Sequence, residues 1–327
     1  MTEFELIDLL RQRAPGSERL RTGIGDDAAI SVPGGATATT VDAVVDGVHF
    51  RSQTSTPEQI AQKAIATALS DLAAMAAQPG EIYVSAGLVR GSDDEFLERL
   101  VRGLARSADR YGAALAGGDT VASPVLFLSI TAVGHAPAER DFVSRSGAGP
   151  GEPVAVTGRI GGARAGLWLL EHGERRPAGI DQTAWRELAD RQLAPEPQVE
   201  AGAALGRAGA SAMIDVSDGL VADLGHLARA SGVGIEIEAS RLPLAAGVGP
   251  VADAAGIDPV VFALGSGEEY ELAAALPEPS LEGAAAAVGE CGSGLTVIGR
   301  TASGPAVVEV SRDGRPLPPV PGHDHLA

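Results

Sequence analysis

The feature that most limits the fold is an alternation of strand-like and helix-like segments along the first 135 residues. The run of small and β-branched residues at 36–48 is typical of a strand, and the apolar pattern at 58–77 is typical of a helix. A strand is expected at 81–89, a helix at 93–111 and a strand at 125–134. Such an alternation predicts a mixed α/β domain, not a helix bundle.

A second α/β domain is expected downstream. Residues 146–153, Ser-Gly-Ala-Gly-Pro-Gly-Glu-Pro, are rich in residues that interrupt regular structure and are the best linker candidate. Strands and alanine-rich helices alternate again beyond them. We therefore predict two domains, at residues 1–137 and 138–327.

Composition excludes several classes of protein. A net charge of −18 argues against a nucleic-acid partner, which requires clustered Lys and Arg. No apolar run approaches the ~20 residues of a membrane span, and the N-terminus does not resemble a signal peptide, so a cytoplasmic location is expected. The single Cys291 rules out an internal disulfide and a thiolate metal cluster.

Five short motifs combine aspartate with glycine or other small residues. They are Gly-Ile-Gly-Asp26-Asp27, Val-Asp42-Ala-Val-Val-Asp46-Gly-Val-His49, Ser70-Asp71-Leu-Ala-Ala-Met, Gly117-Gly118-Asp119-Thr120 and Asp215-Val-Ser217-Asp218-Gly219. Carboxylates are the ligands of hard cations, and several hard cations usually accompany phosphate. These motifs therefore indicate a cation-assisted site for phosphorylated ligands.

Each motif also has a structural explanation. Asp26 and Asp27 could form a solvated loop, and Asp71 could lie at a helix edge. Asp42 is harder to explain in this way, because it lies among strand formers, where a buried carboxylate needs a partner.

The glycine-containing motifs allow two interpretations each. Gly117-Gly118-Asp119, expected where a strand ends, could be a tight turn or a nest of amides for anionic oxygens. Ser217 or Asp218 could cap a helix, and the same helix N-terminus could hold a ligand phosphate. At the C-terminus, His323-Asp324-His325 could bind a metal or form a polar tail.

Read in order, the motifs resemble those of the thiamine-monophosphate kinase family, within the superfamily of aminoimidazole ribonucleotide synthetase-like proteins. The resemblance also rests on Arg145-Ser-Gly-Ala and on Gly265-Ser-Gly-Glu268-Glu269-Tyr-Glu-Leu, and it covers nearly the whole chain. It implies ATP-dependent phosphorylation of thiamine monophosphate to thiamine diphosphate, by direct in-line transfer with several Mg²⁺ ions and no covalent protein nucleophile. It also implies an α/β (α+β) fold and a homodimer in which the N-terminal mixed sheets join into a barrel, while the C-terminal α/β domain completes the active site.

Carried over by motif, the resemblance assigns a role to individual residues. The expected Mg²⁺ ligands are Asp27, Thr40, Asp42, Asp71, Asp119, Asp215 and Asp218, with Val41 contributing only its backbone. The expected ATP contacts are Gly118, Asp119, Arg145 and Ser217. The expected contacts to thiamine monophosphate are His49, Glu268 and His323, the last at a position where the family tends to have an aromatic residue.

Two other functions fit the same motifs. One is another ATP-using enzyme of the superfamily, such as a purine-pathway synthetase or a selenophosphate-forming enzyme. The other is a non-catalytic protein that binds nucleotides or thiamine phosphate. The number of carboxylates favours catalysis, since binding alone does not need so many.

Overall fold

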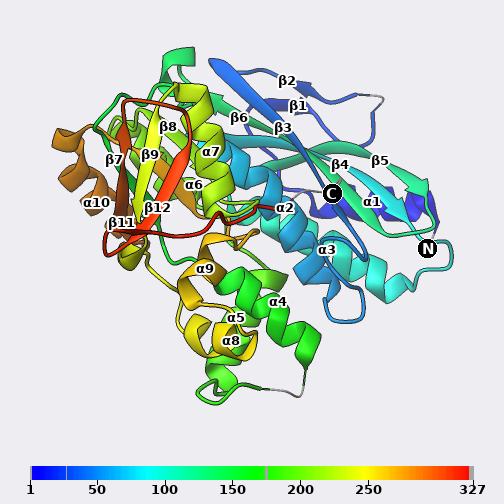
Figure 1. Ribbon diagram of the computed structural model, residues 1–327. Helices are drawn as coiled ribbons and strands as arrows, with labels where there is room; N and C mark the ends of the chain where they lie inside the picture. Colours follow the sequence, from blue (N-terminus) through cyan, green and yellow to red (C-terminus); the bar gives the residue numbers. More distant parts are fainter. Residues whose placement is uncertain (1, 27, 174–175, 324–327) are drawn as a thin grey trace. The chain divides into compact units, whose positions relative to one another are not determined.

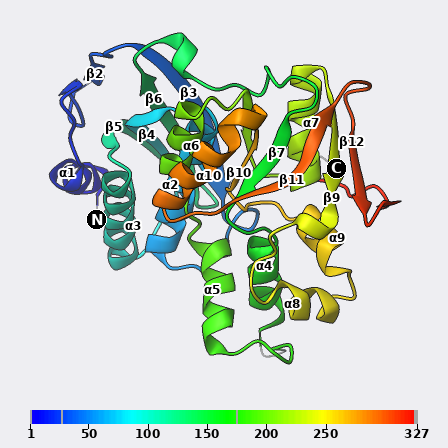
Figure 2. The ribbon, with the colours of Figure 1, turned by 90° about the vertical axis from the view of Figure 1, so that its left-hand side faces the viewer.

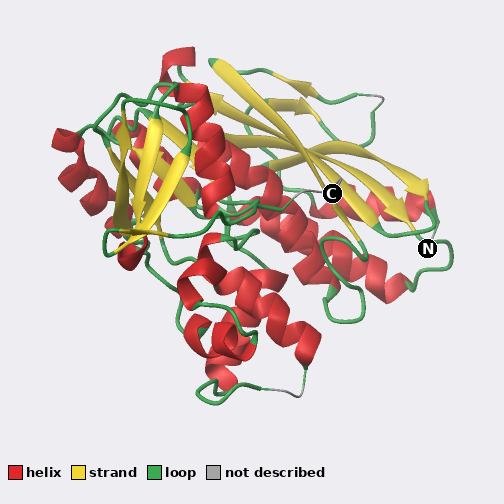
Figure 3. Ribbon diagram, in the orientation of Figure 1, coloured by secondary structure: helices red, strands yellow, loops and turns green. Residues whose placement is uncertain are grey.

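The structure is a computed structural model that describes residues 2–26, 28–173 and 176–323. The chain divides into two compact units (Figure 1). The first comprises Met1–Leu72 and Ala77–Asp141, and the second comprises Ala73–Ala76 and Phe142–Ala327. Each unit combines helices with a sheet, which confirms the α/β class (Figure 3). Across the described residues, every helix is too short or too polar to span a bilayer.

The first unit is built on a four-stranded sheet in the order β3-β6-β4-β5. Strands β3, β6 and β4 pair antiparallel, and β4 and β5 pair parallel. The strands are β3 (Ala36–Val45), β4 (Gln78–Leu88), β5 (Ala114–Ala122) and β6 (Phe127–Ala136). The remaining elements of the unit are α1 (Glu3–Arg13), β1 (Leu20–Thr22), β2 (Ile30–Ser31), α2 (Pro57–Ala74) and α3 (Asp94–Arg110).

Helix α2 supplies the core beside this sheet. Its side chains Ile60, Ile65 and Leu69 are completely buried. The opposite face of β3 is open: Val41 is 65% exposed. Val41 and Asp42 thus lie on different faces of the sheet, because successive strand residues alternate.

Two boundaries differ from the sequence prediction. Helix α2 ends at Ala74, and Ala76 has a positive φ of 55°. Pro79 and Gly80 lie inside β4, at an irregularity in its pairing with β6. A proline is tolerated there because the strand pairing does not require a backbone N–H donor at a bulge.

The second unit contains a seven-stranded sheet in the order β13-β12-β9-β11-β7-β10-β8. Its strands are β7 (Pro153–Thr157), β8 (Ala212–Asp215), β9 (Gly234–Glu238), β10 (Leu272–Ala275), β11 (Leu295–Ala302), β12 (Val308–Arg312) and β13 (Arg315–Pro316). Helix α7 (Leu220–Ser231) packs on one face, and α6 (Val199–Arg207) and α10 (Leu281–Glu290) pack on the other (Figure 2). Because both faces are covered, neighbouring strand residues such as Val154, Ala155 and Val156 are all buried.

A helical group within the second unit has its own apolar core. It consists of α4 (Gly162–His172), α5 (Gln182–Leu193), α8 (Val248–Ala254) and α9 (Pro259–Leu264). Leu169, Leu188, Val251 and Phe262 form its centre. Helix α5 is capped at its start by Asp181, whose carboxylate accepts the amides of residues 183 and 184.

Candidate active site

The strand β3 and the helix α2 bring three of the predicted metal ligands together in the first unit. Thr40 and Asp42 are two residues apart on β3 and therefore lie on one face of the strand. The hydroxyl of Thr40 donates to Asp71 Oδ2 of α2 at 2.5 Å. The carboxylates of Asp42 and Asp71 are partly buried, so this face of β3 presents oxygen atoms of the kind that Mg²⁺ binds. Asp27 lies outside the described residues.

Asp119 lies at the other edge of the same sheet. Its neighbour Gly118 is in register with Val84, Ile130 and then Asp42 across the sheet. Three strand spacings of 4.7–4.9 Å separate the β3 and β5 positions by about 14 Å. Asp119 and Asp42 of one chain are therefore too far apart to bind the same ion.

The Gly117-Gly118-Asp119 motif does not end its strand as expected, because β5 continues to Ala122. Gly118 has a φ of 156°, and a Cβ on it would lie 2.0 Å from the carbonyl oxygen of Val84. Only glycine fits this close approach of β5 to β4. The motif therefore lies within a paired strand and carries an exposed Asp119, so the tight turn, one of the two interpretations, is not formed.

A cavity of about 920 Å³ lies beside this strand, within the first unit. One wall is apolar and comes largely from α3 and β5, with Leu97, Leu100 and Leu115 among its residues. The polar part of the lining includes Arg11 of α1 and Asp119. A volume of this size and mixed polarity suits a small organic ligand with a charged end. Sequence reasoning missed this cavity.

His49 and Asp46 occupy the tight turn that follows β3. The Nδ1 atom of His49 accepts the backbone amide of Val45 at 3.1 Å, so this nitrogen carries no proton. The carboxylate of Asp46 accepts the amide and the hydroxyl of Ser52. Asp46 therefore has a local structural role.

In the second unit, the residues after β8 form a loop around a carboxylate that sequence reasoning did not identify. The Oδ2 atom of Asp223 accepts the consecutive amides of Ser217, Asp218 and Gly219 at 3.0, 3.1 and 3.1 Å. Neither Ser217 nor Asp218 caps the helix with its side chain, since Gly219 occupies the N-cap position of α7. The amides that a phosphate could have used are thus occupied by the chain's own Asp223. The signal that could have revealed Asp223 was an acid in the first turn of a helix.

The negative charge around this loop is concentrated. Asp215 and Asp223 are both only 3% exposed. Burial, with the neighbouring charges of Asp215 and Asp218, raises the pKa of Asp223 to about 7. A divalent cation bound by Asp215 and Asp218 would relieve this repulsion, so the donor set fits Mg²⁺. Among the described residues of one chain, no three His, Cys, Asp or Glu side chains gather closely enough to hold a metal.

The backbone joins this loop to Glu268. The amide of Glu268 donates to the carbonyl oxygen of Ser217 at 2.7 Å, and the amide of His323 donates to that of Asp218 at 2.9 Å. Residues expected to contact ATP, metal and thiamine monophosphate thus lie side by side in the second unit. The partners of His323 in the C-terminal motif, Asp324 and His325, lie outside the described residues.

Arg145 lies beside the C-terminal end of α7. Its carbonyl oxygen accepts the hydroxyl of Ser231, the last residue of that helix. The loop at 217–219 is at the other end of α7, and a helix of 12 residues is about 18 Å long. The side chain of Arg145 is exposed, and its positive charge acts electrostatically on the imidazole of His226, midway along the helix. The structure does not bring the backbone of Arg145 to the loop.

Comparisons with known proteins agree with this arrangement. Residues 25–136 match the N-terminal domain of AIR synthase related proteins, and residues 149–311 match the C-terminal domain. A thiamine-monophosphate kinase of Mycobacterium tuberculosis (strain ATCC 25618 / H37Rv) is 38% identical over 94% of this chain and 87% of its own length. The chain belongs to the thiamine-monophosphate kinase family.

Solved structures of thiamine-monophosphate kinases share the fold. The enzyme from Stenotrophomonas maltophilia K279a is 34% identical and superimposes with a TM-score of 0.84, covering 96% of this chain and 98% of its own. The structure of AaThiL complexed with AMPPCP and TMP is 31% identical, with a TM-score of 0.78 over 99% of this chain and 96% of that chain. That structure contains AMPPCP and TMP in the fold described above.

Proposed function

We infer that this chain phosphorylates thiamine monophosphate with ATP to give thiamine diphosphate. The observation that carries this inference is the near-complete coverage of solved thiamine-monophosphate kinases by a chain of the same fold. The link between Ser217 and Glu268 supports it, because it places an expected ATP contact beside an expected contact to the acceptor.

The test is to incubate the purified protein with ATP, Mg²⁺ and thiamine monophosphate and to separate the thiamine species. We expect equal amounts of thiamine diphosphate and ADP, and no phosphorylation of unphosphorylated thiamine. Binding of both ligands without product over a range of Mg²⁺ concentrations would identify a binding protein. Phosphorylation of a different acceptor would identify another enzyme of the superfamily.

ATP is proposed to bind at the cavity of the first unit. The apolar wall formed by α3 and β5 suits an adenine base, and Gly118 and Asp119, which also line the cavity, are the proposed contacts to the phosphate chain. For the second unit, the resemblance to the family implies Arg145 and Ser217 as contacts to ATP. The guanidinium of Arg145 offers paired donors to phosphate oxygens.

The proposed transfer is direct. An oxygen of the acceptor phosphate attacks the γ-phosphorus of ATP, ADP leaves, and no phosphoenzyme forms. The residues of this chain bind and align the two anions: His49, Glu268 and His323 hold the acceptor. Thr40, Asp42, Asp71, Asp119, Asp215 and Asp218 would hold Mg²⁺, as would Asp27 and the backbone of Val41. Bound Mg²⁺ would neutralise the charge of the transferring group. An absence of ADP–ATP exchange without the acceptor is the expected outcome of this mechanism.

A homodimer is proposed because the ligands are divided between the two edges of one sheet. Asp42 on β3 and Asp119 on β5 of a single chain are separated by about 14 Å. A second copy could bring its β5 beside the β3 of the first. The exposed Val41 and Val121, on the outer face of these strands, would then be covered.

A cytoplasmic location also stays a prediction from the sequence.

Mixed dimers test this arrangement. Asp42→Asn and Asp119→Asn are each expected to be inactive alone. If one site takes Asp42 from one copy and Asp119 from the other, a mixed dimer has one intact site. When the two variants are co-expressed and their chains pair at random, about a quarter of wild-type activity is expected to return. Monomers in sedimentation, or no restored activity in isolated mixed dimers, would refute the shared site.

A further inference from the structure

Helices α4 and α5 are packed unusually closely at the C-terminal end of α5. Gly162 and Gly166 lie one turn apart on α4. A Cβ on Gly166 would lie 2.0 Å from the carbonyl oxygen of Leu188, and one on Gly162 would lie 2.3 Å from Cδ of Arg191. The absence of side chains at these positions lets the last turn of α5 rest directly against α4. That turn is therefore fixed by backbone contact.

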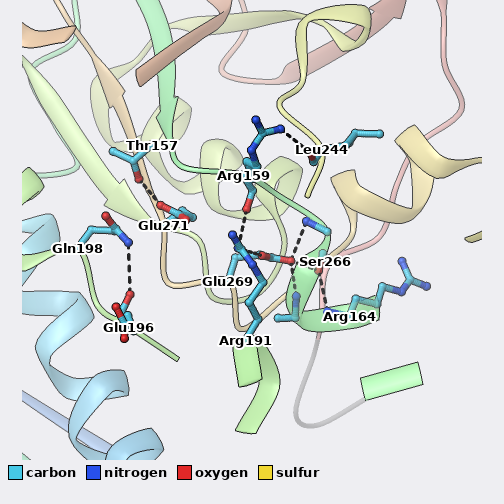
Figure 4. Close-up of polar contacts among 12 residues, drawn as sticks. Thr157, Arg159, Arg164, Arg191, Glu196, Gln198, Leu244, Ser266, Glu269 and Glu271 are labelled. Atoms are coloured by element: carbon cyan, nitrogen blue, oxygen red, sulfur yellow. Dashed lines mark hydrogen bonds and ion pairs between the residues drawn. The ribbon is translucent and has the colours of Figure 1, made fainter. Parts of the chain in front are cut away.

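Two consecutive residues of this turn face two consecutive acids. Nε2 of Gln192 donates to Oε2 of Glu268 at 2.6 Å. Arg191 NH1 lies 4.0 Å from Oε2 of Glu269 and donates to the carbonyl oxygen of Arg159 (Figure 4). Gln192 is only 6% exposed, so its amide is held in place by its surroundings.

The acidic segment is anchored from the other side as well. Oε1 of Glu269 accepts the amides of Gly161 and Ala163 at the start of α4 and the hydroxyl of Ser266 (Figure 4). Glu268 and Tyr270 have positive φ angles of 56° and 53°, which non-glycine residues adopt only where surrounding contacts impose them. The backbone of Glu268 is thus fixed independently of its side chain.

We propose that Gln192 is a positioning residue for thiamine monophosphate, acting through Glu268. The glutamate side chain has three rotatable bonds, and the amide of Gln192 fixes one of its carboxylate oxygens. The direction of the carboxylate toward the ligand is then set before the ligand arrives. Thiamine carries a permanent positive charge on its thiazolium ring, which a carboxylate attracts. This proposal rests on the proposed function, in which Glu268 contacts the acceptor.

The test compares Gln192→Leu with wild type and with Gln192→Asn. Leucine keeps the volume and removes the donor, and asparagine keeps the amide but shortens it. For both variants we expect KM for thiamine monophosphate to rise about tenfold, as for loss of a hydrogen bond to a charged group. KM for ATP and the melting temperature should stay near wild type. Gln182→Leu, the same change at the exposed start of α5, is the matched control.

A double-mutant cycle separates positioning from a structural role. If Gln192 acts through Glu268, Gln192→Leu has little further effect on KM in the Glu268→Gln background. An equal effect in both backgrounds would overturn the proposal, as would an unchanged KM in Gln192→Leu. Equal increases in both KM values with a lowered melting temperature would also overturn it.

Direct binding distinguishes failure of the proposal from failure of the proposed function. The affinity for thiamine monophosphate is measured by calorimetry, which does not require turnover. A wild-type protein that binds thiamine monophosphate but forms no product refutes the kinase function, and the affinity ratio of Gln192→Leu to wild type still decides the role of Gln192. A wild-type protein that does not bind thiamine monophosphate refutes both.

Discussion

Carboxylates of the first unit and of the second unit can be compared in two different surroundings. In the first unit Asp119 is exposed on an edge strand, and the partly buried Asp71 takes a hydrogen bond from Thr40. In the second unit Asp223 and Glu269 are buried, and each accepts backbone amides. Acids of the first kind can bind a ligand, whereas acids of the second kind hold the backbone that carries other acids. Acidic motifs in a sequence therefore do not all indicate ligands.

The largest effect on activity is expected for the acids that can bind a ligand. Asp42→Asn should lower kcat on the order of 10²–10³-fold, because it removes charge stabilisation from the transferring group. The melting temperature should change little. Steady-state kinetics and thermal unfolding measure the two effects, and Asp46→Asn, whose carboxylate binds Ser52, is the control. A comparable loss of stability and activity in Asp42→Asn would show that Asp42 belongs with the structural acids.

An intermediate effect is expected at Asp223. Asp223→Ala leaves three amides without their acceptor and should lower the free energy of unfolding by about 3 kcal/mol. Asp223→Asn keeps an acceptor oxygen, so the fold should survive while the loop carrying Ser217 and Asp218 is held less firmly. The Mg²⁺ concentration for half-maximal activity should then rise several-fold, about as for one weakened hydrogen bond. An unchanged Mg²⁺ dependence in a stable Asp223→Asn protein would contradict the holding role.

The smallest effect is a pH dependence of stability at Glu269. Burial raises the pKa of this carboxyl from its ordinary 4.5 to about 7. The folded chain thus keeps this proton to a higher pH than the unfolded chain does. The contribution of Glu269 to the free energy of unfolding is fully present below about pH 4.5 and is lost as the pH rises through 7.

Glu269→Gln, which stays neutral, should therefore lose less thermal stability than wild type between pH 5 and 8. Melting temperatures across this range measure the effect, and Glu200→Gln at an exposed position of α6 is the control. Parallel pH profiles for Glu269→Gln and wild type would show that Glu269 is not the responsible group.

The sequence predicted the fold class, and it predicted β3 and α2 closely because their side-chain patterns are long and regular. It failed where a local signal competed with tertiary structure. Pro79 and Gly80 normally end an element, yet pairing with β6 incorporates them into a strand. Gly118 suggested a turn, but it is required by the close approach of β5 to Val84.

The candidate site was predicted as a set of residues, and its geometry was not. Asp42 and Asp119 looked equivalent in the sequence, whereas the strand order places them at opposite edges of a sheet. Asp223 was missed because its position in the first turn of a helix does not by itself reveal its contacts with three backbone amides. Gln192 was missed for a similar reason: it lies 76 residues from Glu268 in the chain.

The three amides around Asp223 also provide a natural reporter of motion. Amide protons exchange with solvent deuterium only when their hydrogen bonds open, so residues 217–219 should exchange together. A peptide spanning this loop, followed by mass spectrometry, would measure the free energy of its opening without any catalytic assay. Added nucleotide or Mg²⁺ that engages the loop would slow this exchange.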